Sequence, residues 1–173
     1  MSSPRRHDLV VAIYPQKRGF AFVAFEGWLA PVDWGVRELR SRDRNAQCLR
    51  LLSSIYDLHA PDILVLQDMS ENGTRRVARI RELNTLIAEQ AQTSGLRVHA
   101  FSRKRVIECF RAYGVATKQA IAETIAMQVP ALKLYLPPVR KRWMNEHVRM
   151  SIFDAAALAW TFFHSLEGSR DGA

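Results

Sequence analysis

The sequence contains few cysteines and no long apolar run. Its two cysteines, Cys48 and Cys109, lie far apart and form neither a CxxC motif nor a Cys/His cluster. This spacing gives little support to a disulfide or a zinc site, so we expect two free thiols. No apolar run approaches the roughly 20 residues that span a bilayer, and the first 15 residues turn polar too soon for a signal peptide. We therefore expect a soluble, cytoplasmic protein without a membrane partner.

Acidic residues are outnumbered by basic ones. The 173 residues include 17 Asp and Glu against 25 Lys and Arg, a formal net charge of +8 at pH 7, and most of the basic residues are arginine. The planar guanidinium of arginine matches the geometry of phosphate, so this surplus indicates a polyanionic partner such as nucleic acid. Many basic domains bind no nucleic acid, however, and charge alone leaves the partner open.

Length and composition favour one globular domain. The hydrophobic fraction of 48% and the charged fraction of 24% are ordinary for a folded protein, and a chain of this length can bury a core of its own. We expect an N-terminal tail at residues 1–7, a single domain at 8–166 and a flexible C-terminal tail at 167–173.

Hydrophobic periodicity predicts an α/β domain. Continuous or alternating apolar residues predict strands at 8–14, 20–27, 30–40, 62–68 and 96–102. Apolar residues three and four positions apart predict helices at 44–60, 74–95, 102–110, 117–129 and 149–166. The predicted buried face of the first helix consists of Cys48, Leu51, Leu52, Ile55 and Leu58. This order of elements is that of the ribonuclease-H-like fold, a mixed five-stranded sheet in which a three-stranded antiparallel meander precedes α/β crossovers, with helices on both faces.

Four short stretches carry more specific information. They are VVAIYPQKRGFAFVAFEG at residues 10–27, HAPDILVLQDM at 59–69, YGVATKQAIAETI at 113–125 and SIFDAAALAWTFFH at 151–164. In this order they resemble the RuvC family of Holliday-junction resolvases, which belongs to the ribonuclease-H-like superfamily. The resemblance implies two-metal hydrolysis of phosphodiester bonds, in which four carboxylates hold two Mg²⁺ or Mn²⁺ ions.

The resemblance places neutral side chains at three of the four carboxylate positions. These are Tyr14, expected at the end of the first strand, Gln67 and Ser151, whereas Asp154 keeps a carboxylate. Asp68 follows Gln67, but successive strand residues point to opposite faces, so Asp68 reaches the same site only if the strand ends or bulges there. Hard divalent ions need anionic oxygen ligands, and the pattern therefore predicts a degenerate site, that of a pseudoenzyme. Asp154 and Asp68 are the candidate catalytic and metal-binding carboxylates.

These residues also have ordinary structural interpretations. Tyr14 could be a packed aromatic whose hydroxyl is hydrogen-bonded, and Asp68 could cap the turn or helix that follows it. Glu146 and His147 lie about one turn before Ser151 and could reach the pocket if the last predicted helix begins early.

Positions for phosphate binding match the family better than the metal ligands do. Lys118 corresponds to a family lysine beside the active site, whereas a second family lysine corresponds to Ile107. The other candidate nucleic-acid-binding residues share a positive charge and are Arg103, Lys104, Arg105, Lys17, Arg18, Arg75, Arg76, Arg79, Arg81, Arg140, Lys141 and Arg142. Trp143 follows the last of these and could stack on an unpaired base or lie in the core.

Three functions follow from this sequence. The first is a RuvC-like protein that binds branched or structured nucleic acid, expected to be DNA, with weak or no nuclease activity, alone or with a recombination or nuclease partner protein. The second is an active Mg²⁺- or Mn²⁺-dependent endonuclease of the resolvase type, with a remodelled site around Asp68 and Asp154. The third is a protein-binding scaffold. RuvC-type resolvases act as dimers; the sequence leaves open whether this chain forms a homodimer, and the apolar face of the helix starting near Thr74 is one plausible interface.

Overall fold

The structure is a computed structural model that describes residues 7–70 and 78–170. The five strands form one sheet in the order β3-β2-β1-β4-β5. They are β1 (Leu9–Gln16), β2 (Gly19–Glu26), β3 (Pro31–Glu38), β4 (Ile63–Gln67) and β5 (Arg97–Phe101). The helices are α1 (Arg44–His59), α2 (Ala78–Thr93), α3 (Arg103–Arg111), α4 (Lys118–Gln128), the 3-10 helix η1 (Pro130–Tyr135) and α5 (Met150–Arg170). The first three strands pair antiparallel, whereas β4 pairs parallel with β1 and β5, so the predicted α/β ribonuclease-H-like architecture is confirmed.

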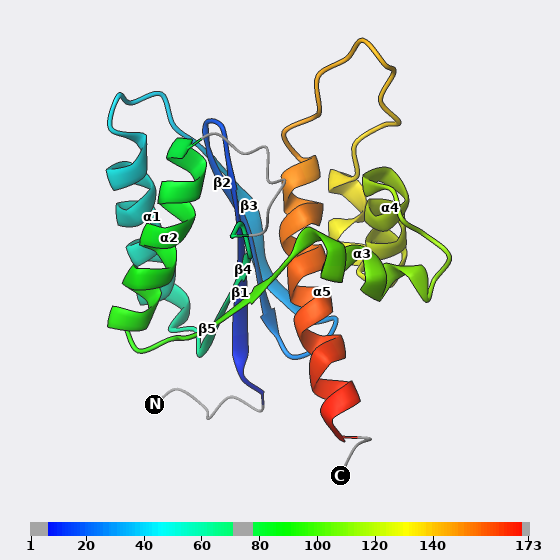
Figure 1. Ribbon diagram of the computed structural model, residues 1–173, viewed down its shortest axis with the longest axis horizontal. Coiled ribbons are helices and arrows are strands. Elements are labelled where there is room, and N and C mark those ends of the chain that lie inside the picture. Colours follow the sequence, from blue (N-terminus) through cyan, green and yellow to red (C-terminus); the bar gives the residue numbers. More distant parts are fainter. Residues whose placement is uncertain (1–6, 71–77, 171–173) are drawn as a thin grey trace.

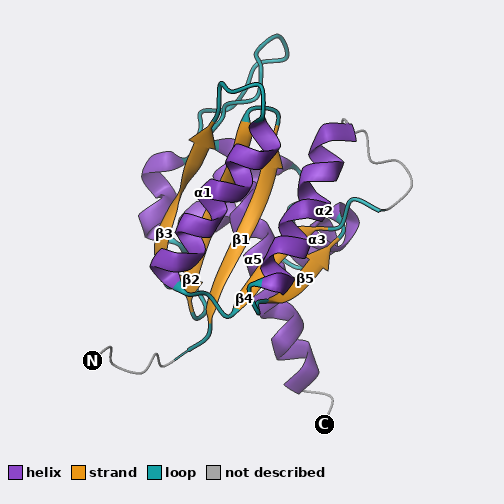
Figure 2. Cartoon of the chain, turned by 90° about the vertical axis from the view of Figure 1, so that its left-hand side faces the viewer, coloured by secondary structure: helices purple, strands orange, loops and turns teal. Residues whose placement is uncertain are grey.

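Helices cover both faces of the sheet. Figure 1 shows α1 and α2 on one face and α3, α4 and α5 on the other, and in Figure 2 α1 and α2 lie in front of the sheet. Each face has its own core, and β1 contributes to both: Val11 and Ile13 pack toward α1 and α2, whereas Val10 and Ala12 pack toward α5. Burial on both faces explains the nearly continuous apolar run of this strand.

Helix α5 packs closely on the sheet. Ala155, Ala156 and Ala159 are at most 1% exposed, and their small side chains let the helix approach β1 and β2. Phe153 fills the same core. This packing determines where Asp154 lies relative to β1.

The first hairpin is tighter than expected. β1 continues to Gln16, which pairs with Gly19 across a two-residue turn. Gly19 has a φ of +143°, and a Cβ there would come 1.8 Å from the carbonyl oxygen of Arg37, so this position requires glycine. Because the glycine lets β2 begin immediately after the turn, Tyr14 lies within β1, and the expectation that it ends the strand is wrong.

The apolar face of α2 is covered by the sheet. Ile80, Leu83 and Ile87 are at most 4% exposed and belong to the core between α1, α2 and the strands. Along the described part of the helix this face is therefore unavailable as a homodimer interface. Thr74, the expected start of the helix, lies outside the described residues.

Other helices differ from expectation in details. Leu58 is 73% exposed because it lies on the flank of the face centred on Leu52, and Tyr56 is buried there. Helix α5 continues to Arg170, into the segment 167–173 that we expect to be flexible. Within the described residues, no helix combines the length and the apolar character needed to cross a membrane.

Candidate functional site

One cavity lies between the sheet and the helices α3, α4 and α5. Its lining includes Tyr14 of β1, Gln67 at the end of β4, Lys118 at the start of α4 and Asp154 of α5. Three of the four positions that the resemblance assigns to carboxylates thus come together with the matching lysine. The cavity has a volume of about 30 Å³, which is room for about one water molecule.

A cluster of charges surrounds Lys118, one of the residues that line this cavity. The Lys118 Nζ lies 3.0 Å from the Asp154 Oδ2 and donates hydrogen bonds to Glu146 at 2.8 Å (Oε1) and 3.0 Å (Oε2). The same ammonium lies 5.6 Å from the centroid of the Tyr14 ring. The Asp154 side chain is 11% exposed and that of Lys118 is 26% exposed. A buried carboxylate, a half-exposed one and an aromatic ring therefore surround one lysine.

Burial and neighbouring charges oppose each other in this cluster. Burial raises the pKa of the Asp154 carboxyl, while the nearby Lys118 ammonium, and to a smaller degree Arg103, lower it, and burial prevails. Burial also disfavours the charged form of Lys118, but Asp154, Tyr14 and Glu146 together outweigh it and raise the pKa of the lysine above its ordinary value. Lys118 is therefore a permanent cation at neutral pH.

Local structure explains how Lys118 and Glu146 meet. Thr117 caps α4, and its hydroxyl accepts a hydrogen bond from the Ala120 N–H at 3.2 Å, so that Lys118 is the first helical residue. Glu146 approaches from the segment that precedes α5. Helix α5 begins at Met150, so there is no early helix start; Glu146 contacts Lys118 from the preceding loop and does not line the Tyr14–Asp154 cavity. His147 does not line the Tyr14–Asp154 cavity, and its Nδ1 accepts a hydrogen bond from the Arg149 N–H.

Ser151 lies outside the cavity, whereas Ile107 lies in its wall. Ser151 is 5% exposed, and its hydroxyl donates to the Val148 carbonyl at 2.6 Å, within the turn that opens α5. It does not line the cavity, although it shares a helix with Asp154. Ile107, at the position of the second family lysine, lies in the cavity wall and adds apolar surface there.

Asp68 lies outside this cavity. Its carboxylate accepts hydrogen bonds from the Ser70 N–H at 2.9 Å and the Ser70 hydroxyl at 2.5 Å, and these bonds lower its pKa. It lines a separate hollow beside α2, together with Asn84 and Thr85. The strand ends at Gln67, as a shared site would require, but Asp68 turns toward its own loop instead of toward Asp154.

The donor set does not fit the pair of Mg²⁺ or Mn²⁺ ions that the resemblance implies. Among the described residues that line the cavity, Asp154 is the one carboxylate, and Lys118 is paired with it. Elsewhere in residues 7–70 and 78–170, no three His, Cys, Asp or Glu side chains are grouped in a way that could hold a metal ion. Mg²⁺ and Mn²⁺ need several anionic oxygens as ligands. The Lys118 ammonium, 3.0 Å from the Asp154 Oδ2, competes with a metal ion for this carboxylate.

Most candidate basic residues are exposed. Lys17 and Arg18 form the turn of the first hairpin, and Arg103, Lys104 and Arg105 open α3. Of these, Arg103 also lines the cavity, a role that the sequence did not indicate.

Two further basic groups differ in availability. Arg79 donates hydrogen bonds to the Lys17 carbonyl at 2.6 Å and to Asn45 at 2.9 Å, so it braces the hairpin. Arg75 and Arg76 lie outside the described residues. The other group, Arg140 to Arg142, lies in the loop at residues 137–149, which is exposed from residue 138 onward and projects from the same end of the molecule as the hairpin turn (Figure 1).

Known structures share this arrangement of elements. No protein-family model matches the chain, and no curated protein sequence matches it. T. thermophilus RuvC, solved in complex with a Holliday junction substrate, superposes with a TM-score of 0.67 at 15% identity, covering 94% of this chain and 97% of that one. This chain has the RuvC fold.

Two other solved structures agree. A Thermus thermophilus RuvC structure gives a TM-score of 0.65 at 19% identity, covering 92% of this chain and 96% of that one. The yeast mitochondrial Holliday junction resolvase Ydc2 gives 0.58 at 10% identity, covering 89% and 77%. The RuvC fold thus spans nearly the whole chain, while the chemistry depends on the residues that this chain places in its cavity.

Proposed function

We propose that this RuvC-fold protein binds branched DNA and does not hydrolyse it through two divalent metal ions. One observation carries the proposal: the Lys118 ammonium lies 3.0 Å from the Asp154 carboxylate and 2.8 Å from that of Glu146. A two-metal nuclease needs its carboxylates available for Mg²⁺ or Mn²⁺. Here a cation that belongs to the chain lies against both acids and pairs with them in place of a metal ion, which supports a pseudoenzyme.

The lining of the cavity supports the same proposal. Two catalytic ions lie about 3.5–4 Å apart and need several anionic oxygens between them, whereas the described lining supplies one carboxylate, that of Asp154. An entering ion would have to displace Lys118, whose ammonium would stay nearby and repel it. The neutral Tyr14 and Gln67 supply no charge to compensate for that repulsion.

Exposed positive charge supports the DNA-binding half of the proposal. Lys17 and Arg18, the Arg103–Arg105 run and the basic part of the 137–149 loop are free to meet solvent. Such groups bind phosphates by releasing condensed counterions, which makes affinity depend steeply on salt. Because a RuvC of the same fold has been solved with a Holliday junction, the four-way junction is the first substrate to test.

A binding experiment tests this half. Fluorescence anisotropy would measure the affinity for a labelled four-way junction and for a duplex of matching sequence over a range of salt concentrations. We expect tighter binding to the junction and a linear fall of log K with log salt. If neither DNA is bound at low salt, the proposal fails and the protein-binding scaffold becomes the better explanation.

A cleavage experiment tests the other half. Junction, duplex and single-stranded substrates would be incubated with Mg²⁺ or Mn²⁺, with Asp154→Asn as the matched control. We expect no product above that of the control. Cleavage that Asp154→Asn abolishes would instead identify an active endonuclease, and Asp68→Asn would then show whether the second carboxylate of a remodelled site is Asp68.

A homodimer and a recombination or nuclease partner protein remain predictions. A four-way junction has paired arms, so two symmetry-related copies could each bind one pair. Light scattering after gel filtration, with and without the junction, would measure the number of chains per complex, and one chain per junction would contradict the dimer.

A further inference from the structure

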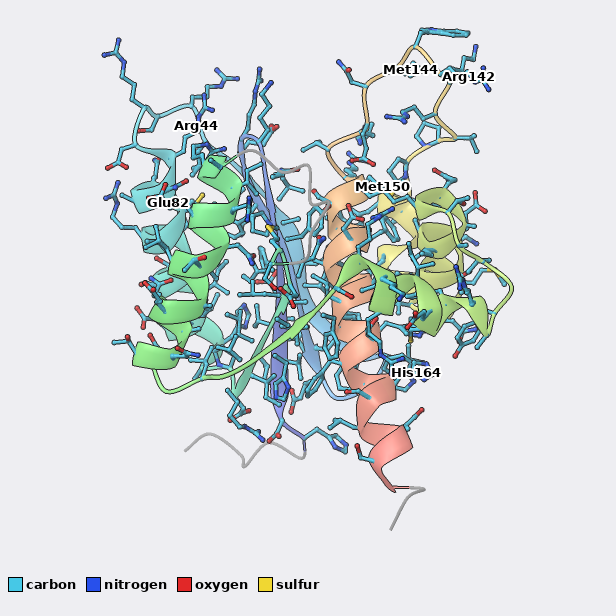
Figure 3. The ribbon with its side chains drawn as sticks, viewed as in Figure 1. Arg44, Glu82, Arg142, Met144, Met150 and His164 are labelled. Atoms are coloured by element: carbon cyan, nitrogen blue, oxygen red, sulfur yellow. The ribbon has the colours of Figure 1, made fainter. Side chains whose placement is uncertain are left out.

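Trp143 is exposed at the tip of the 137–149 loop. Its side chain is 80% exposed, and residues 138–149 are all exposed. Figure 3 labels its two neighbours, Arg142 and Met144, at the far end of the loop, well beyond Met150 at the start of α5. The core interpretation of Trp143 is therefore wrong. A single exposed apolar side chain needs no explanation of its own, so the surroundings of the ring are decisive.

The ring of Trp143 is surrounded by positive charge. Arg140, Lys141 and Arg142 directly precede it, and the Lys141 Nζ lies 5.4 Å from the ring centroid. Lys141 occupies one face of the indole, and the exposure of the side chain leaves further ring surface open to solvent. A flat π-surface bordered by cations matches a nucleotide, which presents a base and a phosphate together.

Contacts within the loop and with the folded domain hold the loop in place. At its tip, the Met144 N–H donates to the Lys141 carbonyl at 3.0 Å and closes a turn around Trp143. Glu146 is held by Lys118, and the Arg149 guanidinium lies 5.8 Å from the Tyr135 ring. The 137–149 segment contains three arginines and one lysine against a single acid, Glu146, which is bound to Lys118, so the loop offers a ligand mainly positive charge.

We infer that Trp143 stacks on an unpaired base, with Arg140 to Arg142 on the adjoining phosphates, so that the 137–149 loop selects branched or open DNA over continuous duplex. This inference rests on the proposed DNA binding and adds the origin of its selectivity. In a duplex each base is already stacked on both sides, whereas a branch point or a single strand exposes base faces. The basic run alone would bind both kinds of DNA equally, because phosphate contacts carry no information on pairing.

The test compares Trp143→Ala with two matched variants. Trp143→Phe keeps an aromatic ring, and Leu134→Ala removes another exposed apolar side chain, 87% exposed on η1. Affinities for a four-way junction, a single strand and a matched duplex would be measured by anisotropy at one salt concentration. We expect Trp143→Ala to weaken junction and single-strand binding by about 5- to 150-fold, the range for single base–aromatic stacks. Duplex binding should change by less than about 2-fold, and both matched variants should stay close to wild type.

Three outcomes would overturn the inference. An equal loss on junction and duplex would make Trp143 a general contact, and no loss would remove it from the interface. Binding to anionic lipid vesicles that shifts the fluorescence of wild type, but not of Trp143→Ala, would assign the loop to a membrane surface instead. If wild type binds neither DNA, the proposed function fails too; if it binds the junction and Trp143→Ala does so equally well, only this inference fails.

Discussion

Replacing Lys118 by methionine should cost a large and pH-dependent part of the folding free energy. Methionine keeps most of the apolar stem of lysine but removes the ammonium that lies 3.0 Å from Asp154. The Asp154 side chain, 11% exposed, would be left as a buried charge without its partner. Breaking a buried ion pair in this way typically costs about 3–5 kcal/mol. Glu146 is 46% exposed, and losing its contact adds little.

Protonation sets the upper limit of this cost. Each pH unit between an ordinary carboxyl pKa of about 3.9 and neutrality is worth about 1.4 kcal/mol, so neutralising Asp154 near pH 7 costs about 4 kcal/mol. The variant should therefore lose about 3–4 kcal/mol near pH 7 and less than about 1 kcal/mol near pH 4. The sign follows from burial, which raises the pKa of Asp154 in the folded state. The folded state then binds the proton more tightly than the unfolded state, and stability is lost as the pH rises.

Urea unfolding of wild type and Lys118→Met at several pH values would measure this difference. The control is the double variant Lys118→Met/Asp154→Leu, which removes both charges and should recover to within about 1–2 kcal/mol of wild type. A loss below about 1 kcal/mol near pH 7, or one that does not change with pH, would refute the assignment of a buried pair.

Three other expectations concern the hairpin, a thiol and the missing carboxylate. Gly19→Ala should destabilise the protein by about 2–4 kcal/mol in urea unfolding, because its Cβ would lie 1.8 Å from a carbonyl oxygen; Gly114→Ala, with open space around its Cβ, should cost about 1 kcal/mol. Burial raises the pKa of the Cys48 thiol to about 11, so mass spectrometry should find it unlabelled by maleimide in native protein and labelled after unfolding. Tyr14→Asp alone should produce no Mg²⁺- or Mn²⁺-dependent cleavage in a junction assay, since Gln67 and Ser151 stay neutral and Lys118 still pairs with Asp154; appearance of product would contradict the proposed competition.

The fold could be predicted from the sequence because its signals are local. The apolar run of β1, the period of α1 and the small residues of α5 each reflect burial of the same stretch of chain. The polar residues after Tyr14 predict that the strand ends there, whereas β1 continues to Gln16. Gly19 permits a turn of two residues, which the spacing of polar residues does not reveal. The prediction that Leu58 is buried is wrong for a similar reason, since helical spacing alone does not distinguish the centre of a buried face from its flank.

The cavity was only partly predictable. The resemblance assigns Tyr14, Gln67 and Asp154 to one site, and all three line the same cavity. The pairing of Lys118 with Glu146 joins residues 28 positions apart, and it depends on how a loop crosses the start of α4. No periodicity or spacing encodes such a contact, and a lysine matched to a phosphate-binding position gives no sign that it faces two acids.

The Lys118 cluster also bears on how such a protein could change. The Lys118 ammonium is covalently part of the chain, so a chelator cannot remove it. The cavity therefore holds a cation in every folded molecule, whatever the concentration of Mg²⁺. A variant lineage with metal chemistry in this cavity would have to lose this lysine and acquire several acids. Either step taken alone would leave buried charge uncompensated. The intermediate sequences would then have a lower free energy of unfolding than both the present protein and a metal-binding variant. Loss of stability would therefore oppose a stepwise change from one to the other.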